Sequence, residues 1–233
     1  MDGILLVDKP AEWTSMDVCA HLRGVLHEKH IGHTGTLDPN ATGLLVVLTG
    51  KGTKAAKYAE NDTKEYAARL RTGLRTDTQD IWGNVLEENE PVNDRGRLEA
   101  VLERFRGEIL QLPPMYSAIK IRGKKLYEIA RRGGSVEREP RPVTIFRLEL
   151  LDRDENGDWG LDVMCSKGTY IRTLCSDIGD AAGCGGCMSA LRRIRCGDFD
   201  ISEAHTLEEI RRDPEGCMLT LDRILGKVQT DNE

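Results

Sequence analysis

Two short apolar runs, far apart in the chain, most constrain the fold. The run GILLV covers residues 3–7, and LLVVLTG covers residues 44–50, where Gly50 ends the apolar pattern. Each run is short and continuous, which is typical of a strand buried in a sheet. Neither approaches the length of about 18 apolar residues that a membrane span needs. The chain is therefore expected to build much of its core around a sheet.

The rest of the chain mixes strands and helices without a strict βαβ alternation. A first helix is expected after Thr14 or Ser15, either of which can cap it. Its apolar positions follow helical spacing: Val18, Leu22, Val25 and Leu26. Further helices are expected at 53–59, 98–105, 125–132, 171–182 and in a short tail from about 205, and strands at 64–73, 118–121, 143–152, 159–165 and 188–196. This order predicts an α+β fold with a mixed, mostly antiparallel sheet flanked by helices.

Composition favours a water-soluble, cytoplasmic protein. The 233 residues are 39% hydrophobic and 31% charged, and the N-terminal MDGILLVDKPAEW lacks the basic start of a signal peptide. The seven cysteines are an odd number spread over a long chain, which does not indicate a disulfide framework. Only Cys184 and Cys187 have metal-like spacing, and no second pair is placed to complete a zinc site. Buried thiols are therefore expected.

Charge is distributed unevenly along the chain. The formal net charge is −6, but residues 119–141 carry +5, so the remaining residues carry −11. A basic segment on an acidic body can bind a polyanion. A solvated, charged helix explains the same residues, so the charge pattern alone leaves both interpretations open.

The segment IGHTGTLDPNATG, residues 31–43, places one carboxylate, Asp38, in a loop rich in glycine and threonine. Pro39 keeps Asp38 out of the helical backbone region, and the glycines allow another chain to approach closely. Such a loop could present a catalytic carboxylate to a large substrate. An ordinary Asx-type turn fits these residues equally well.

Possible partners for Asp38 lie far away in the sequence. Tyr170 and Arg172 would face one cleft if residues 165–174 were extended, and an arginine beside an aspartate keeps the aspartate ionised. Arg172 could equally be a surface residue. Arg192, Arg193 and Arg195 could extend a basic surface.

Three other features have two interpretations each. Tyr66 could stack on a nucleobase or pack in the core. The polar segment RTDTQD, residues 75–80, could be calcium-like or a solvated loop. His33 could bind a ligand, although a loop histidine more often only makes hydrogen bonds.

Seven segments carry a resemblance to a known family. They are LLVDKP, GHTGTLDPNATGLLVV, GKGTKAAKY, KEYAARLRTGLRTDTQD, PPMYSAIKIRGKKLYEIARRG, CSKGTYIRTL and ALRRIRCG. In this order they resemble the bacterial tRNA pseudouridine-55 synthases of the TruB type, from about residue 3 to residue 212. The resemblance implies a pseudouridine synthase fold with a single catalytic domain over 1–233. It also implies an RNA-clamping insertion at about 112–142 and a short tail at about 205–233.

The resemblance assigns roles residue by residue. Asp38 matches the catalytic aspartate, Arg172 matches the arginine that holds it by a salt bridge, and Tyr66 matches the tyrosine that stacks on the target uracil. Substrate contacts are implied for His33, Tyr170, Asp77, Leu191 and Lys9. Lys124 and Lys125 lie in the insertion that closes over the T arm of tRNA.

The chemistry that the resemblance implies is the conversion of uridine 55 in the T loop to pseudouridine. The base leaves its stack, its N1–C1′ bond breaks, and C5 joins C1′. Asp38 could act at C6, at C1′ or on the 2′ proton, and the sequence leaves these routes open. Neither a metal nor an organic cofactor is expected, and a monomer should act on tRNA without a protein partner or a membrane.

One departure from the family concerns the C-terminus. Typical members continue into a PUA-like RNA-binding domain, and the residues after His205 are expected to be too few for it. Two alternative functions stay open beside the enzyme: an RNA chaperone on a synthase fold, and a guide-RNA-dependent relative that modifies ribosomal RNA.

Overall fold

The computed structural model describes residues 1–56, 63–117, 119–121, 123–130 and 132–224. The chain forms two compact units, the first made of Met1–Ala67 with Leu191–Glu233 and the second of Ala68–Ala190. Strands β4 (Lys64–Thr72) and β12 (Gly186–Cys196) each contain a point where one unit continues into the other.

A mixed sheet organises the first unit, with the strand order β14–β1–β3–β12. Strand β1 runs antiparallel to β3, and β3 runs parallel to β12 where Gly43 faces Arg193. Strand β2 also pairs with β3, and β13 pairs with β12. The elements are β1 (Gly3–Lys9), α1 (Ser15–Leu26), β2 (Ile31–His33), β3 (Thr42–Thr49), η1 (Gly50–Ala55), β13 (Phe199–Asp200), η3 (Ile201–Glu203), α6 (Leu207–Arg212) and β14 (Met218–Leu219).

The two apolar runs form the centre of this unit, as predicted. Nearly every residue of β1 and β3 is buried, so both strands are covered on both faces. One core cluster consists of Ile4, Leu6, Leu44, Val46, Leu48, Ala55, Cys196, Phe199 and Ile224. Helix α1 begins with a capping box in which Thr14 and Asp17 exchange backbone and side-chain hydrogen bonds, which confirms Thr14 as the cap.

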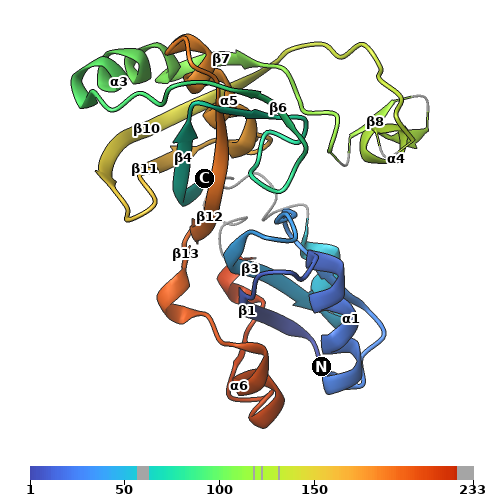
Figure 1. Ribbon diagram of the computed structural model, residues 1–233. Coiled ribbons are helices and arrows are strands. Elements are labelled where there is room, and N and C mark those ends of the chain that lie inside the picture. The colour runs from blue at the N-terminus through green and yellow to red at the C-terminus, as the bar shows by residue number, and fades with distance from the viewer. Residues whose placement is uncertain (57–62, 118, 122, 131, 225–233) are drawn as a thin grey trace, which may run out of the picture. The chain divides into compact units, whose positions relative to one another are not determined.

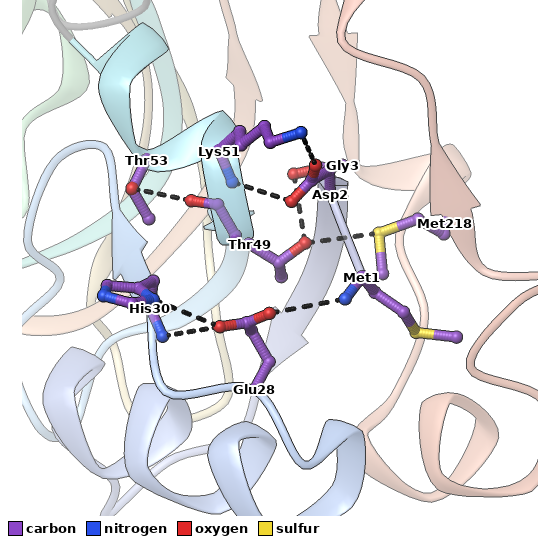
Figure 2. A network of polar contacts seen from close by, with 10 residues as sticks. Met1, Asp2, Gly3, Glu28, His30, Thr49, Lys51, Thr53 and Met218 are labelled. Carbon is purple, nitrogen blue, oxygen red and sulfur yellow. Dashed lines mark hydrogen bonds and ion pairs between the residues drawn. The ribbon is translucent and has the colours of Figure 1, made fainter.

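Polar contacts hold the N-terminal end of β1 in the same sheet (Figure 2). The Met1 ammonium lies 3.4 Å from Glu28, which also accepts a hydrogen bond from the His30 amide. The Asp2 carboxylate accepts a hydrogen bond from the Lys51 amide, and the Thr49 hydroxyl donates to the Gly3 carbonyl. These contacts connect β1 to the ends of α1 and β3.

The second unit is built on the strand order β4–β11–β10–β7, with two small hairpins, β5–β6 and β8–β9 (Figure 1). Its elements are β5 (Leu74–Thr76), β6 (Val85–Glu88), α3 (Arg95–Leu102), η2 (Glu103–Phe105), β7 (Gly107–Gln111), β8 (Lys120–Ile121), β9 (Lys124–Lys125), α4 (Leu126–Ala130), β10 (Arg141–Arg153), β11 (Trp159–Cys165) and α5 (Ile171–Ala181). Strands β10 and β11 form the predicted antiparallel hairpin.

Several elements differ from the prediction. The helix expected at 53–59 is the 3₁₀ helix η1, which ends at Ala55, and residues 57–59 lie outside the described part of the chain. Strands β5, β6 and β7 were not predicted. All four residues of β6 are exposed, and β7 is exposed along most of its length, so neither shows an apolar pattern. Arg172 lies in the first turn of α5, so residues 165–174 are not extended throughout.

The seven cysteines are all buried and free. This confirms the expectation of buried thiols. None of the helices in the described residues has both the length and the apolar character that crossing a membrane requires.

Candidate active site

Asp38 lies in a tight turn between β2 and β3 in the first unit. The Ala41 amide donates a hydrogen bond to the Asp38 carbonyl at 3.1 Å, which makes Asp38 the first residue and Pro39 the second of a four-residue turn. Both residue types are favoured at these positions. The Asp38 side chain is partly exposed, so a substrate can reach it.

The loop that carries Asp38 is fixed by side chains from other elements. Ser15, at the start of α1, accepts a hydrogen bond from the Leu37 amide at 2.9 Å and donates to the Leu37 carbonyl at 3.2 Å. The Thr34 amide donates to the Val46 carbonyl in β3 at 3.0 Å. The residue before Asp38 is therefore held on both its amide and its carbonyl.

Lys9 supports this loop from within the core. Its ammonium donates to the carbonyls of Pro10, Trp13 and Pro39 at 2.8, 2.6 and 2.9 Å. The side chain is fully buried. The predicted substrate contact of Lys9 is corrected by these bonds, because all three donors of the ammonium are used by backbone carbonyls and the group is out of reach of a substrate.

Electrostatic interactions link Lys9 to Asp38. Burial lowers the pKa of Lys9 from 10.5 to about 8, and the negative charge of Asp38 opposes this shift. The opposition means that the ammonium of Lys9 and the carboxylate of Asp38 attract each other.

His33 precedes the loop, at the end of β2. Burial and the nearby positive charge of Arg193 lower the pKa of His33, which keeps its imidazole neutral at pH 7. Its Nδ1 atom is buried and makes no hydrogen bond to any described residue. A neutral imidazole can donate or accept a hydrogen bond, and the predicted contact of His33 with a nucleotide stays a prediction.

Tyr66 and Leu191 are mostly buried in the first unit. Tyr66 lies in β4 with 6% of its surface exposed, and Leu191 lies in β12 with 8% exposed. Their predicted roles, stacking on the uracil and forming an apolar wall, need only one face or edge to reach the base. These roles stay predictions.

Arg193 does not extend a basic surface as expected. It is fully buried, because side chains alternate between the two faces of β12 and Arg193 points inward. Arg192 is half exposed and pairs with both carboxylate oxygens of Asp8 at 3.0 and 2.8 Å. Arg195 is also half exposed and lies 2.8 Å from Asp200.

A cavity of about 410 Å³ lies beside Lys9 in the first unit, with Asp8, Thr42 and Arg192 in its lining. The Arg192 guanidinium is already paired with Asp8 there. We assign no ligand to this cavity, because its charged groups already have partners.

Arg172, at the start of α5 in the second unit, is held by several contacts. Its Nη1 donates to the Thr78 carbonyl and its Nη2 to the Tyr116 carbonyl, both at 2.9 Å. The Asp80 carboxylate lies 3.8 Å from its Nε. Only 6% of the Arg172 side chain is exposed, so these contacts hold the guanidinium in one orientation.

The segment 75–80 contains two aspartates with different roles. The Asp77 carboxylate accepts hydrogen bonds from the amide and the side chain of Asn84, at 2.8 and 2.9 Å, and so closes the 77–84 loop. Asp80, which sequence reasoning did not single out, is the one that faces Arg172. These contacts give Asp77 a structural role, and its predicted substrate contact stays a prediction. The identical side chains gave no signal that could separate the two residues.

Tyr170 is fixed through its backbone. The side chain of Gln111 accepts a hydrogen bond from the Tyr170 amide at 2.8 Å and donates to its carbonyl at 3.1 Å. Gln111 is buried at the end of β7. The strand β7 that was not predicted therefore positions the start of α5, which carries Arg172.

The basic lobe contains the small hairpin β8–β9, in which Lys120 faces Lys125 and Ile121 faces Lys124. Helix α4 follows directly. Arg122 and Arg131 of the basic segment lie outside the described residues. In the part of the chain that the structure describes, no group of three or more His, Cys, Asp or Glu side chains is placed to hold a metal ion.

Two family models together match most of the chain. The model described as TruB family pseudouridylate synthase (N terminal domain) matches residues 23–171. The model described as tRNA pseudouridylate synthase B C-terminal domain matches residues 172–226. The chain belongs to the TruB family. It therefore has the pseudouridine synthase fold that the resemblance implied.

Curated relatives match over a similar length. The tRNA pseudouridine synthase B of Alkaliphilus oremlandii is 46% identical over 224 residues, which are 95% of this chain and 75% of the relative. The protein of the same name from Chromobacterium violaceum is 50% identical over 210 residues, which are 90% of this chain and 68% of the relative.

Solved structures agree with the family fold. A chain in the crystal structure of a Cbf5-Nop10-Gar1 complex matches with a TM-score of 0.71 and 31% identity over 90% of this chain. A chain in an H/ACA RNP bound to a substrate RNA containing 2′-deoxyuridine matches with a TM-score of 0.67 and 27% identity. This chain spans about half the length of both, at 54% and 52%.

Proposed function

We propose that this protein is a tRNA pseudouridine synthase that isomerises uridine 55 in the T loop to pseudouridine. The observation that supports this most strongly is the match of nearly the whole chain to proteins named tRNA pseudouridine synthase B. The rigidly held loop that presents Asp38 is consistent with a catalytic carboxylate. Because the substrate is tRNA, we place the enzyme in the cytoplasm.

Within this proposal Asp38 is the catalytic carboxylate. The uridine must leave its stack to reach it, which costs a few kcal/mol that a pocket has to offset. An ionised Asp38 could then attack C6 or C1′, or remove the 2′ proton. Arg172 is the guanidinium that the family resemblance assigns to Asp38, and its fixed orientation in the second unit suits that role.

The other residues bind or shape the substrate. We propose that Tyr66 stacks on the uracil, that Leu191 supplies an apolar wall, that Tyr170 contacts the substrate, and that His33 contacts the extruded nucleotide. Lys124 and Lys125 contact phosphates of the T arm. The buried Lys9 supports the Asp38 loop. Asp77 closes the 77–84 loop, and we propose that it also contacts the substrate. We propose that the protein acts as a monomer and needs no cofactor.

The variant Asp38→Asn tests the catalytic role of Asp38. It keeps the shape of the side chain and the backbone turn but removes the charge. We expect single-turnover release of tritium from [5-³H]uridine-labelled tRNA to fall at least about a hundredfold, while the dissociation constant for tRNA stays within about threefold.

The matched control is Asp222→Asn, which removes an exposed carboxylate from the same unit and should retain the wild-type rate. A tRNA in which uridine 55 is replaced by cytidine should release no tritium from the T loop. Retained isomerisation by Asp38→Asn would refute the assignment of Asp38. Absence of tritium release from wild-type enzyme and intact tRNA would refute the proposed function itself.

A further inference from the structure

Arg193 contacts both ends of the loop that carries Asp38. From the C-terminal part of β12, its Nε donates to the Leu44 carbonyl at 2.7 Å. Its Nη2 donates to the Gly35 carbonyl at 3.1 Å. Gly35 lies three residues before Asp38 and Leu44 six residues after it. One rigid guanidinium therefore spans the loop at its base.

The charge of Arg193 is unusual for a buried group. The side chain is fully buried, and among the described residues its hydrogen bonds go only to backbone carbonyls. Its Nη1 is buried and makes no hydrogen bond within that part of the chain. Buried arginines are normally paired with carboxylates, because desolvating a charge is costly. An apolar residue could fill the same volume at lower cost, so the charge calls for another explanation.

The charges around Arg193 suggest that explanation. Its positive charge affects the pKa of two neighbours, His33 and Lys9, and lowers both. The same Lys9 is attracted by Asp38. Two buried cations, Lys9 and Arg193, are thus associated with a loop whose carboxylate must be ionised to react.

We propose that Arg193 is a positioning residue for catalysis, which fixes the Asp38 loop at Gly35 and Leu44 and supplies a buried positive charge beside it. This inference rests on the proposed function and deepens it. Arg193 does not touch the substrate, because it has no exposed surface. A carboxylate displaced by about 1 Å can lose on the order of a hundredfold in rate, so a clamp at the base of its loop has a large effect on the reaction.

Two variants separate the paired hydrogen bonds of the Arg193 guanidinium from its positive charge. Arg193→Met keeps the length of the side chain but removes both donors and the charge. Arg193→Lys keeps the charge and can reach one carbonyl at a time. The matched control is Arg106→Met, because Arg106 in the second unit also donates through Nε and Nη2 to a backbone carbonyl, that of Leu148.

Three measurements are made on each protein below its melting temperature: single-turnover tritium release, the dissociation constant for tRNA, and amide hydrogen exchange. For Arg193→Met we expect the rate to fall at least about thirtyfold and the dissociation constant to stay within about threefold. Exchange should accelerate in residues 35–44. Arg193→Lys should recover part of the rate, to within about tenfold of wild type. Arg106→Met should keep the wild-type rate and exchange in residues 35–44.

The proposal is overturned if folded Arg193→Met retains a rate within twofold of wild type. It is also overturned if the rate falls but exchange accelerates evenly over the whole first unit, which would indicate a general structural role. If Arg193→Met does not fold, Arg193→Lys provides the test. A wild-type rate and wild-type exchange in that variant would show that the two hydrogen bonds of the guanidinium are not required, and would overturn the proposal. If wild-type enzyme itself releases no tritium, the proposed function fails, while the exchange in residues 35–44 still tests the clamp.

Discussion

Two adjacent arginines illustrate what a single residue contributes in this fold. Arg192 and Arg193 are identical in type and adjacent in sequence, yet Arg192 is half exposed and paired with Asp8, whereas Arg193 is fully buried. Strand alternation sends them to opposite faces of β12. The sequence pattern predicts one basic surface for both, because an arginine is rarely fully buried.

The Asp38 turn was more accessible to sequence reasoning. Its signals are local, since Pro39 and the neighbouring glycines define the backbone by their own chemistry. The supporting contacts are not local. Lys9 donates a hydrogen bond to a carbonyl 30 residues away, and Arg193 donates to two carbonyls about 150 residues away. A sequence pattern does not reveal which distant carbonyl a buried cation will find.

Asp177, in α5, provides a prediction about pH. Burial, reinforced by the charge of Asp180, raises the pKa of Asp177 from 3.8 to about 6. The folded protein therefore holds this proton more tightly than the unfolded chain does. Stability is lost as the pH rises from about 4 to about 6, and the loss is complete above that. Asp177→Asn should raise the free energy of unfolding at pH 7.5 by on the order of 1–3 kcal/mol. The gain should shrink as the pH falls towards 4.

Denaturant unfolding at pH 7.5, 6 and 4.5 measures this gain. Glu155→Gln is the control, because it removes an exposed carboxylate in the same unit and should leave the curve unchanged. An equal gain at all three pH values would show that protonation of Asp177 is not the cause.

At the scale of elements, the parallel contact between β3 and β12 depends on Gly43. Its φ is +95°, and a Cβ atom there would lie 2.3 Å from the Arg193 carbonyl oxygen and 2.8 Å from the Arg193 nitrogen. Both atoms belong to the backbone and cannot rotate away. Gly43→Ala should lower the free energy of unfolding by about 2–4 kcal/mol and should reduce activity, because it displaces the end of the Asp38 loop.

Chemical denaturation measures the loss, with Gly24→Ala as its counterpart. Gly24 lies in α1, where an added Cβ atom would meet nothing from another element within 4 Å. An alanine there should be neutral or stabilise by about 0.5–1 kcal/mol. Similar effects of the two substitutions would mean that the close approach of β3 and β12 is not what requires Gly43.

The hairpin β8–β9 carries a prediction about RNA binding. If Lys124 and Lys125 meet phosphates, changing both to alanine should weaken tRNA binding and flatten its dependence on salt, by roughly 0.7–0.9 in logarithmic slope per lost contact. Binding measured from 50 to 300 mM KCl gives the slope. The exposed Lys29, in the first unit, is the control as Lys29→Ala. An unchanged salt dependence in the double variant would show that Lys124 and Lys125 do not contact phosphates.

Strands with a buried face could be predicted from the sequence, and exposed strands could not. The hairpin of β10 and β11 was predicted, since inward-facing residues give each strand an apolar pattern and ENGD marks the turn between them. Strand β7, whose sequence GEILQ is exposed except near its end, has no such pattern and pairs with β10. That unpredicted strand ends in Gln111, which fixes Tyr170.

For the whole molecule, the question is whether tRNA alone is enough as substrate. Solved neighbours include a chain of a Cbf5 complex and a chain of an H/ACA RNP, and this chain spans about half the length of each. The curated relatives, with higher identity and coverage, are named as tRNA enzymes. We therefore expect activity on an in vitro tRNA transcript without guide RNA or added protein, from a monomer by light scattering.

Tritium release from that transcript is measured with and without guide RNA. A refolding assay with misfolded tRNA tests the chaperone alternative. Wild-type protein that refolds tRNA but releases no tritium would favour a chaperone. Activity only after addition of a guide RNA would favour the guide-dependent relatives.

The burial of all seven thiols has a practical consequence. Burial raises the pKa of Cys187 to about 12, and the pKa of Cys175 is raised as well, so neither forms the thiolate that reacts with maleimides near neutral pH. The native protein should remain unlabelled, and labelling should follow the opening of the fold. A fluorophore could thus be attached at one engineered surface cysteine without first deleting the natural ones.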